Sequence, residues 1–541
     1  MVRLVERAAA ARGDSLLIGH LLRTPLATAP RQQIVFRDEF RHDYASLRGR
    51  IGRLASALQA RGVTPGSTVA VLDWDSHRYL ECYFAVPMMG AVLQTVNVRL
   101  SPEQVAYTLE HARAEVVLVH RDFAPLFEAI RAQLPRVRVV VPLGAGADAG
   151  CGYEAMLAEA PGDFPFTDFD ENAVATTFYT TGTTGLPKAV CFTHRQIVVH
   201  TLAMAAALAG AELGQSLRQG DVYMPLTPMF HVHAWGVPYV ATLLGLKQVY
   251  PGRYDPAMLL QLRAREGVTY SHCVPTILQM LLDAAAAGGV DLAGWKVNIG
   301  GSALNAALAK RALSRGIDVF AAYGMSETCP YLTATRVTPA VRARGEDAEV
   351  EQRCRTGLPA PMVDLRIVDE AMQDVPHDGT AVGEIVVRAP WLTLGYAGDA
   401  AASEQLWRGG WLHTGDIASQ DADGYVQIRD RLKDVIKTGG EWLSSLQLED
   451  LVARVPGVAE VAVIGLPDER WGERPVALVV RRADAAGEAL TAALVRAALA
   501  PYVERGEIVR YAVPERIEFV AALARTSVGK IDKKKMRAER Q

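Results

Sequence analysis

The chain has 541 residues, half of them hydrophobic and 22% charged, and its formal net charge is −3. This length is too great for one hydrophobic core, so we expect two or more domains. The nearly balanced charge gives no electrostatic argument for a nucleic-acid or anionic-membrane partner. The six cysteines are scattered without a C-x-x-C pair, which argues against disulfides or structural zinc and predicts reduced thiols in a cytoplasmic protein.

The N-terminal part of the chain alternates between helical and strand patterns, which favours α/β layers. Apolar residues at helical spacing predict a helix over residues 44–61, which Gly62 should end, and Ser101 and Pro102 mark the start of another. The most apolar stretch, residues 82–98, is short for a membrane span and predicts a buried helix running into a strand. Continuous apolar runs, typical of buried parallel strands, lie at residues 69–72, 116–119 and 137–141.

The stretch from Tyr179 to Lys188 concentrates hydroxyl groups and glycines around one lysine. Its loop residues are Thr180, Thr181, Gly182, Thr183, Thr184 and Gly185. Glycines let backbone N–H groups approach an anion, hydroxyls add donors and a metal ligand, and Lys188 adds a point charge, so the stretch predicts a phosphate cradle. A Walker loop is a poor match, because Pro187 precedes the lysine, no Ser or Thr follows it, and strands are predicted on both sides. The alternative is an ordinary polar turn, which the length and density of the stretch disfavour.

Three later segments offer groups that suit a nucleotide. A glycine-rich turn with Gly301, Ser302 and Ala303 joins a short strand to a helix predicted over residues 304–313, and its backbone can admit a flat base or sugar. The second segment has a ring for stacking, a hydroxyl and a carboxylate suited to Mg²⁺, and comprises Ala322, Tyr323, Gly324, Met325, Ser326 and Glu327. In the third, Asp416 follows a tight turn and can accept from both ribose hydroxyls. Taken alone, each segment is better explained as a surface loop or a capped turn.

The segment from Pro228 to Trp235 contains two histidines two residues apart. His231 and His233 would lie on one face of a strand and could bind a metal there, but no third ligand cluster lies nearby in the sequence, which disfavours zinc. The alternative is a core position for one of them. Trp235 continues the apolar, strand-like run, where a wide aromatic ring can close a tunnel.

The C-terminal fifth of the chain has the pattern of a separate small α/β domain. Helices are predicted over residues 446–455 and 490–499, and strands over 461–464 and 476–480. A hairpin turn is predicted at residues 421–424, and the charge-dense segment 336–355 is expected to be an exposed excursion. Near the end Lys530 stands in a basic segment, in which we expect Lys533, Lys534 and Lys535 to be surface residues.

Taken in chain order, these motifs resemble those of the adenylate-forming (AMP-binding) superfamily, which contains acyl-CoA synthetases, luciferases and peptide-synthetase adenylation domains. The matching segments are 179–189, 230–235, 323–327, 411–416, 430–442 and 525–530. Segments 230–235 and 439–442 are most similar to fatty-acyl-CoA ligases. The chain departs from the usual residues at five positions, with Ala189 for Gly, His233 for Asn, Asp430 for Gly, Ala524 for Pro and Ser326 for Thr, the last of which keeps the hydroxyl.

The resemblance implies a fold and a set of site residues. The fold is α/β, with a large multi-layer AMP-binding domain that holds the acyl pocket over residues 1–430 and a small mobile α+β lid over 431–541, hinged at Lys433. The implied nucleotide-binding residues are Thr180 to Gly185, Lys188, Gly301, Ser302, Ala303, Ala322, Tyr323, Gly324, Met325, Ser326, Asp416, Arg431, Lys437 and Trp442. The implied catalytic residues are Lys530, His231, Thr183 and Glu327, and Thr183 and Glu327 would bind Mg²⁺. His231 and Trp235 would line the acyl pocket, and Gly439, Gly440 and Glu441 the CoA passage.

The implied reaction has two steps. A carboxylate, here a medium- or long-chain fatty acid, attacks the α-phosphate of MgATP to give acyl-AMP and pyrophosphate, and the CoA thiol then takes the acyl group and releases AMP. The alternatives are an enzyme that loads a carrier-protein thiol, a luciferase-like oxidase that uses acyl-AMP and O₂, and a non-catalytic nucleotide-binding protein. Lys530 and Glu327 argue against the last. The expected partners are the acid, ATP and CoA, with a homodimer as the candidate assembly and no nucleic acid or transmembrane segment.

Overall fold

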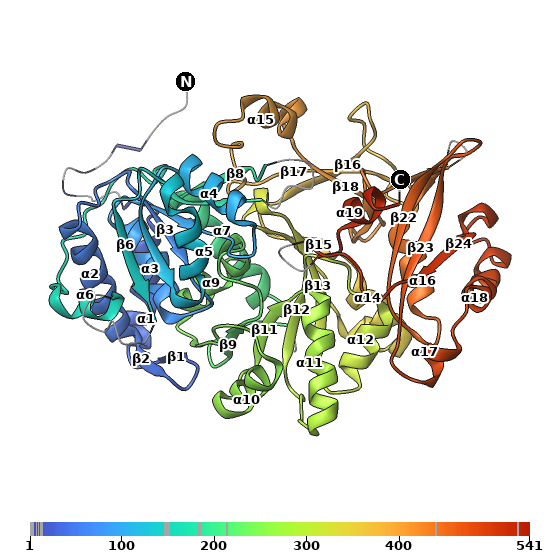
Figure 1. The fold of residues 1–541 in the computed structure, drawn as a ribbon, viewed down its shortest axis with the longest axis horizontal. Helices are drawn as coiled ribbons and strands as arrows, with labels where there is room; N and C mark the ends of the chain where they lie inside the picture. Colours follow the sequence, from blue (N-terminus) through green and yellow to red (C-terminus); the bar gives the residue numbers. More distant parts are fainter. Residues whose placement is uncertain are drawn as a thin grey trace.

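The computed structural model describes residues 14–144, 152–180, 186–211, 215–438, 441–526 and 530–540, together with residues 5, 6, 8 and 10. Helices and strands alternate along most of this chain, so the predicted α/β class is confirmed. Figure 1 shows the chain progressing across the molecule, from a first sheet with its helices (blue), through a central region (green and yellow), to a C-terminal unit (red) at the far end.

The first sheet has six strands in the order β6-β5-β3-β4-β7-β8, and all neighbours are parallel except β7 and β8. The strands are β3 (Thr68–Leu72), β4 (Val92–Thr95), β5 (Ala114–His120), β6 (Val139–Leu143), β7 (Val174–Tyr179) and β8 (Ala189–Thr193). The predicted parallel strands are confirmed. Their continuous apolar composition reflects the burial of β3 and β5 on both faces.

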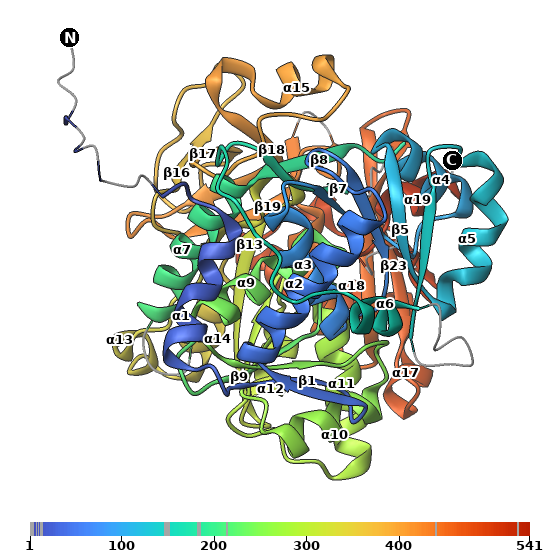
Figure 2. The same cartoon turned by 90° about the vertical axis from the view of Figure 1, so that its left-hand side faces the viewer.

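Helices pack against this sheet, and Figure 2 shows α2 and α3 in front of its strands. The helices of this part of the chain are α1 (Arg23–Thr28), α2 (Tyr44–Ala60), α3 (His77–Met88), α4 (Pro102–His111), α5 (Ala124–Ile130), α6 (Tyr153–Glu159) and α7 (His194–Ala209). The helix predicted over residues 44–61 is α2, and α3 runs into β4 as predicted for the apolar stretch 82–98. Ser101 caps α4 by accepting from the Gln104 N–H, and Pro102 is the first helical residue.

The central sheet has nine strands in the order β15-β14-β13-β12-β11-β9-β10-β1-β2. The strands are β1 (Gln33–Phe36), β2 (Phe40–Asp43), β9 (Val222–Pro225), β10 (Lys247–Tyr250), β11 (Tyr270–Cys273), β12 (Lys296–Ile299), β13 (Asp318–Gly324), β14 (Tyr331–Ala334) and β15 (Leu358–Pro359). Its helices are α9 (Val237–Leu243), α10 (Pro256–Glu266), α11 (Pro275–Gly288) and α12 (Ala306–Leu313). The carboxyl ends of the parallel strands β9, β11, β12 and β13 meet at one edge, where a ligand site of an α/β sheet is expected.

The segment 336–355 is more ordered than predicted. It forms two helices, α13 (Pro339–Arg342) and α14 (Glu346–Cys354). The prediction of an exposed excursion is wrong for Arg353, which is only 2% exposed and pairs with Asp318 at 2.5 Å and Glu349 at 2.7 Å. Two carboxylates compensate this buried guanidinium, a pairing that a count of charges along the sequence does not reveal.

A four-stranded antiparallel sheet follows, in the order β16-β17-β18-β19. Its strands are β16 (Asp364–Val368), β17 (Gly383–Arg388), β18 (Leu412–Gln420) and β19 (Val426–Arg431), with α15 (Ala400–Leu406) between β17 and β18. The turn predicted at residues 421–424 joins β18 to β19. Gly424, the last residue of this turn, has a positive φ of 83°, which glycine adopts without strain. This sheet carries Asp416 and ends at Arg431.

The C-terminal unit has its own five-stranded sheet and its own hydrophobic core. Its elements are β20 (Ile436–Thr438), β21 (Glu441–Leu443), α16 (Ser445–Ala453), β22 (Val458–Asp468), β23 (Gly472–Arg481), α17 (Ala485–Ala489), α18 (Ala492–Glu504), β24 (Arg516–Phe519) and α19 (Lys533–Ala538). The helices and strands predicted here are confirmed. The chain leaves the preceding sheet at Arg431 and enters this one at Ile436, with Lys433 in the intervening turn.

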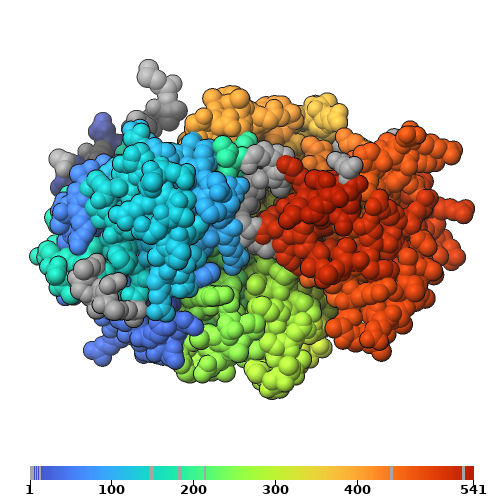
Figure 3. Space-filling model, in the orientation of Figure 1, coloured from blue at the N-terminus to red at the C-terminus, as the bar shows by residue number. Residues whose placement is uncertain are grey.

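Figure 3 shows the C-terminal unit (red) abutting the central region (green) and facing the first unit (blue). None of the described helices is long and apolar enough to cross a membrane. The five cysteines within the described residues, Cys82, Cys191, Cys273, Cys329 and Cys354, form no disulfide, as predicted.

Candidate active site

The phosphate-loop stretch is held between two antiparallel strands. β7 pairs with β8 up to Tyr179 and Ala189, the Thr180 N–H donates to the Lys188 carbonyl at 2.9 Å, and the Lys188 N–H donates to Thr180 Oγ1 at 3.4 Å. The flanking strands are thus confirmed, and a strand-to-strand loop explains the poor match to a Walker loop. The methyl group of Ala189, where the resembling family has Gly, lies buried in this pair. Five predicted residues lie outside the described residues: Thr181, Gly182, Thr183, Thr184 and Gly185.

Tyr396 joins the end of that loop to the predicted metal ligand. The ammonium of Lys188 lies 4.6 Å from the centre of the Tyr396 ring, and the Tyr396 hydroxyl donates to Glu327 Oε1 at 2.7 Å. The sequence analysis missed this tyrosine. A single tyrosine between β17 and β18 carries no charge and belongs to no polar cluster, so the sequence offers no signal for it.

Glu327 is buried, with 7% of its surface exposed. Burial raises the pKa of its carboxyl group, while the Tyr396 hydrogen bond and the nearby Lys530 act in the opposite direction. A carboxylate is a hard-oxygen ligand of the kind that Mg²⁺ prefers, so Glu327 fits this ion. Thr183, the predicted second ligand, lies outside the described residues.

Asp416 stands in a cluster with an aromatic and a cationic side chain. The Tyr323 hydroxyl donates to Asp416 Oδ2 at 2.7 Å, and Arg431 Nε lies 3.4 Å from Asp416 Oδ1. Gly415, with a φ of 71°, turns the backbone immediately before Asp416. The structure therefore brings together three of the predicted nucleotide-binding residues, from β13, β18 and the end of β19.

Lys530 reaches this cluster from the C-terminal unit. Its Cε lies 3.2 Å from the position that a Cβ would occupy on Gly301, whose φ is 73°. Burial and, to a smaller extent, the charge of Arg431 lower the pKa of Lys530 to about 8, against the opposing effect of Asp416 and Glu327. The turn predicted after β12 thus lies against the predicted catalytic lysine, and the positive φ and the close approach both favour glycine at position 301.

The remaining members of the two nucleotide segments lie around these groups. Ser302 and Ala303 continue the turn after Gly301, where the helix α12 starts at Ala306 with an Asn305 cap, slightly later than predicted. The residues of the other segment close β13 and the short turn that follows it: Ala322, Gly324, Met325 and Ser326.

The prediction that Trp235 and the two histidines lie on a strand is wrong. Residues 232–235 form one left-handed turn, with φ values of 48° at Val232, 54° at His233, 47° at Ala234 and 58° at Trp235. Each such residue costs about 1 kcal/mol when it is not glycine, so the surrounding packing must impose the turn. His200 contributes, because its ring lies against Gly236 and its Nε2 accepts from the Tyr331 N–H at 3.2 Å.

The left-handed turn sends the two histidines in different directions. His231 lines a cavity, and burial together with Lys530 and Arg99 lowers its pKa to about 3, so its ring is neutral at physiological pH. His233 is 1% exposed and packs edge-on against the rings of Tyr83 and Phe178. The alternative of a core role therefore holds for His233. Within the described chain, no three His, Cys, Asp or Glu side chains are grouped to hold a metal ion.

A cavity of about 50 Å³ lies where these elements meet. Its lining includes both predicted acyl-pocket residues and the predicted catalytic lysine, together with apolar and polar side chains: His231, Trp235, Lys530, Leu226, Thr227, Pro228, Val274, Thr276, Ile277, Arg99 and Tyr254. The sequence analysis missed Arg99 and Tyr254, because they come from distant segments that carry no motif. The Trp235 ring packs on the Gly300 turn, where an added Cβ would lie 3.0 Å from it.

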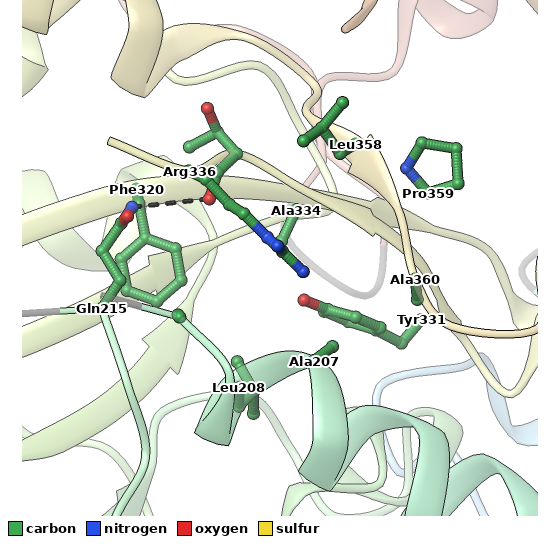
Figure 4. Close-up of a pocket in the computed structure, with 12 residues that line it drawn as sticks. Ala207, Leu208, Gln215, Phe320, Tyr331, Ala334, Arg336, Leu358, Pro359 and Ala360 are labelled. Carbon is green, nitrogen blue, oxygen red and sulfur yellow. Dashed lines mark hydrogen bonds between the residues drawn. The ribbon is translucent and has the colours of Figure 1, made fainter. Parts of the chain in front are cut away.

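A second, smaller cavity of about 10 Å³ (Figure 4) is lined in part by an apolar cluster against which Trp235 packs. Ala207 and Leu208 from α7, Phe320 from β13 and Tyr331 from β14 belong both to this cluster and to the cavity lining. Arg336 projects into the cavity beside the Tyr331 ring (Figure 4). The apolar cluster thus contributes to the lining of the cavity at the end of α7, and it is packed by Trp235, which lines the cavity at His231.

Other predicted residues are less closely tied to the site. Lys437 is exposed on β20, where its N–H donates to Glu473 at 2.9 Å. Glu441 and Trp442 lie in the strand β21, and Gly439 and Gly440 lie outside the described residues. The prediction that Lys533 is a surface residue is wrong, because it is 7% exposed and pairs with Glu449 at 2.7 Å. Lys534 and Lys535 are exposed as predicted.

Comparisons with known proteins agree with this geometry. The AMP-binding enzyme family matches residues 22–397, and the C-terminal domain of the AMP-binding enzymes matches residues 447–530. A long-chain-fatty-acid–CoA ligase of Thermus thermophilus is 41% identical over 537 residues, which cover 97% of this chain and 96% of that protein. A 3-methylmercaptopropionyl-CoA ligase of Ruegeria lacuscaerulensis is 37% identical, with 92% of both chains covered. Among solved structures, the anthranilate CoA ligase AuaEII in complex with anthranoyl-AMP superposes with a TM-score of 0.85 at 25% identity, with 97% of both chains covered.

Proposed function

This chain belongs to the AMP-binding enzyme family, and we propose that it is an ATP-dependent, AMP-forming acid–CoA ligase that acts on a fatty acid. The observation that carries the proposal is the position of Lys530. This lysine comes from the C-terminal unit, yet it lies half-buried against the Gly301 turn of the large unit and interacts electrostatically with Glu327 and Asp416. A cation delivered to a nucleotide-sized site by a separate domain suits a reaction that needs it in one step only.

The first half-reaction joins a carboxylate to the α-phosphate of ATP. Two anions approach each other, so the transition state needs positive charge and N–H donors already in place. Lys530 supplies the charge, and the loop that starts at Thr180 and ends at Lys188 supplies donors for the leaving pyrophosphate. Glu327 and Thr183 would hold Mg²⁺, which neutralises phosphate charge when bound.

The ribose of the nucleotide lies at Asp416. Its carboxylate can accept from both ribose hydroxyls, and its existing bond from Tyr323 fixes its orientation. Arg431 pairs with the same carboxylate and stands where the chain passes from one unit to the other, so its position can change with the orientation of the C-terminal unit. Ser302, Ala303 and the residues around Met325 provide the backbone against which the adenine lies.

The second half-reaction transfers the acyl group to the CoA thiol. The C-terminal unit turns about Lys433 so that Lys530 leaves and the turn with Gly439, Gly440 and Glu441 approaches. Support comes from the chain path, because Lys433 stands in a turn between a strand of one sheet and a strand of the next. Hinges are a few residues at such element ends. On this basis the division into residues 1–430 and 431–541 is part of the proposal.

The acid enters at the cavity beside His231, with its carboxylate toward Lys530. The chain of the acid extends past Trp235 into the apolar cluster, toward the cavity at Ala207 (Figure 4). The relatives are named for acids that range from a long-chain fatty acid to 3-methylmercaptopropionate. We propose that the acid of this enzyme is a medium- or long-chain fatty acid.

A panel of carboxylic acids tests the proposal. We expect acid-dependent pyrophosphate release from ATP, followed by AMP and a thioester when CoA is added. Pyrophosphate release without a CoA thioester would support the carrier-loading enzyme instead, and consumption of O₂ would support the oxidase. Binding of ATP without turnover on any acid would overturn the proposal. Gel filtration of the same protein tests the predicted homodimer, and fractionation of its source cells tests the predicted cytoplasmic location.

A further inference from the structure

A buried polar network crosses from the four-stranded sheet to the C-terminal unit. Asp430 of β19 accepts at Oδ2 from the Ser445 N–H at 2.5 Å and from the Ser445 hydroxyl at 2.6 Å. Next to it, the Ser444 hydroxyl donates to the Arg429 carbonyl. Asp430 is 2% exposed and Ser445 is fully buried, so water does not compete for these bonds.

The network continues into the segment that carries the catalytic lysine. Lys533 donates to the Ser445 hydroxyl at 2.6 Å and pairs with Glu449 of α16 at 2.7 Å. Lys533 begins α19, three positions after Lys530 in the sequence. A continuous path of short contacts therefore leads from Asp430, through the N-terminus of α16, to the base of the Lys530 segment.

The two ends of this path lie on opposite sides of the proposed hinge. Asp430 is fixed in the sheet by its pairing with Ile417 of β18, and it precedes Lys433 in the chain. Ser445, Glu449 and Lys533 all follow Lys433 and belong to the C-terminal unit. A rotation of that unit about Lys433 would displace Ser445 relative to Asp430, so these bonds form in one orientation of the unit.

The charges of the network suit such a contact. Asp430 and Glu449 share the single ammonium of Lys533, and Lys533 keeps its ion pair with Glu449 when Asp430 is absent. Removal of Asp430 therefore leaves no buried cation without a partner, whereas removal of Lys533 would leave two buried carboxylates without theirs. The sequence analysis noted Asp430 only as a departure from the usual glycine, and a glycine could form no such bond.

We propose that Asp430 is a positioning residue for the adenylation half-reaction: through Ser445 and Lys533 it holds the Lys530 segment at the Gly301 turn. This inference rests on the proposed function. Asp430 would therefore affect the two half-reactions differently. Its contact with Ser445 favours the orientation in which Lys530 lies at the Gly301 turn, and the contact is absent from the orientation that admits CoA.

The test compares the two half-reactions in Asp430→Ala and in the parent protein. We expect pyrophosphate release in a single turnover to slow about ten- to a hundredfold, as for the loss of one charge-assisted hydrogen bond. Thioester formation from supplied acyl-AMP and CoA should be unchanged or faster. Hydrogen exchange at the Ser445 amide should quicken in the variant, because that N–H loses its acceptor.

Matched variants separate positioning from general damage. Asp430→Asn keeps an amide oxygen for Ser445 and should restore part of the adenylation rate. Ser445→Ala added to Asp430→Ala should cost little more than Asp430→Ala alone, because both act on one contact. Arg474→Ala serves as control, since it removes a 2.7 Å ion pair with Glu515 that lies wholly within the C-terminal unit, and it should change neither half-reaction.

The outcomes distinguish this inference from the proposed function. If the parent protein releases no pyrophosphate with any acid, the proposed function fails. If the parent is active and Asp430→Ala slows both half-reactions equally, or slows neither, Asp430 does not position Lys530 and the inference is overturned. A melting curve close to that of the parent shows that the comparison is made on folded protein.

Discussion

The two halves of the active site are built differently. In the large unit, the Glu327 and Asp416 carboxylates each accept a 2.7 Å hydrogen bond from a tyrosine, and both are buried within or beside β-sheets. In the C-terminal unit, the backbone at Lys530 is held by a hydrogen bond in which the Thr526 N–H donates to the Lys530 carbonyl at 2.7 Å. On the proposed function, the contrast means that the carboxylates on the nucleotide side are held in place within the large unit, whereas the proposed catalytic lysine comes from a separate unit.

The largest effect should follow removal of the delivered cation. Lys530→Ala is expected to lower adenylation by about 10²–10³-fold, the usual loss for one transition-state donor. Thioester formation from supplied acyl-AMP should change far less, because that step uses the other orientation of the C-terminal unit. Separate assays of pyrophosphate release and thioester formation provide the measurement. Equal losses in the two assays would contradict the proposal that Lys530 acts in adenylation and not in thioester formation.

Much of the preorganised half could be predicted from the sequence. The loop residues 179–188, the turn at Gly301 and the carboxylates Glu327 and Asp416 are recognisable because small or charged residues stand out in apolar surroundings. The strands on both sides of the loop and the short strand before Gly301 are also predicted from apolar residues. Gly301 and Glu327 follow the parallel strands β12 and β13, whose carboxyl ends share an edge, whereas the loop and Asp416 reach the site from two other sheets, which no rule of sequence predicts.

Three features could not be predicted, for physical reasons. The left-handed turn at residues 232–235 contains no glycine, so no residue marks a conformation that the packing imposes. Tyr396 is uncharged and lies far from Glu327 in the chain. The burial of Lys533 depends on Glu449 of the C-terminal unit and on the nearby Asp430 of the preceding sheet. Both approach it only in the folded protein, and a basic run in the sequence gives no sign of such partners.

A second prediction concerns the movement that delivers the cation. Lys433→Pro fixes φ near −65° and removes an N–H at the proposed hinge. We expect acyl-AMP to form in a single turnover, while CoA-dependent turnover falls by about 10²-fold, because the unit is trapped in one orientation. Quenched-flow assays of the two steps on protein with normal melting behaviour make the measurement. If the steps fall together, Lys433 is an ordinary turn residue.

The third prediction uses the environment of Lys530. Its pKa is lowered from 10.5 to about 8, so the free enzyme carries the charged lysine below pH 8 and the neutral amine above it. In adenylation, kcat/KM for ATP should therefore fall about tenfold per pH unit above pH 8. The value of kcat should fall only at a higher pH, because the negative charge of the bound triphosphate stabilises the ammonium form of Lys530. Lys530→Arg stays charged, so whatever activity it retains should lack the fall. A flat profile in the parent protein to pH 10 would contradict the role of this lysine.

The smallest effect should come from the acyl side, where the preorganised half meets the variable substrate. Trp235 separates the cavity at His231 from the apolar cluster, so Trp235→Ala should change the relative kcat/KM among acids of different length by about tenfold, the range that one or two methylene contacts produce. The Michaelis constant for ATP should stay nearly constant, since the nucleotide contacts lie at Asp416 and Tyr323. Ala207→Phe is the matched variant, because it fills the far cavity in Figure 4 and should weaken only the longer acids. An unchanged acid profile in Trp235→Ala with impaired use of ATP would move Trp235 from the acyl side to the nucleotide side. Loss of short and long acids alike in Ala207→Phe would show that the chain of the acid does not run through the apolar cluster.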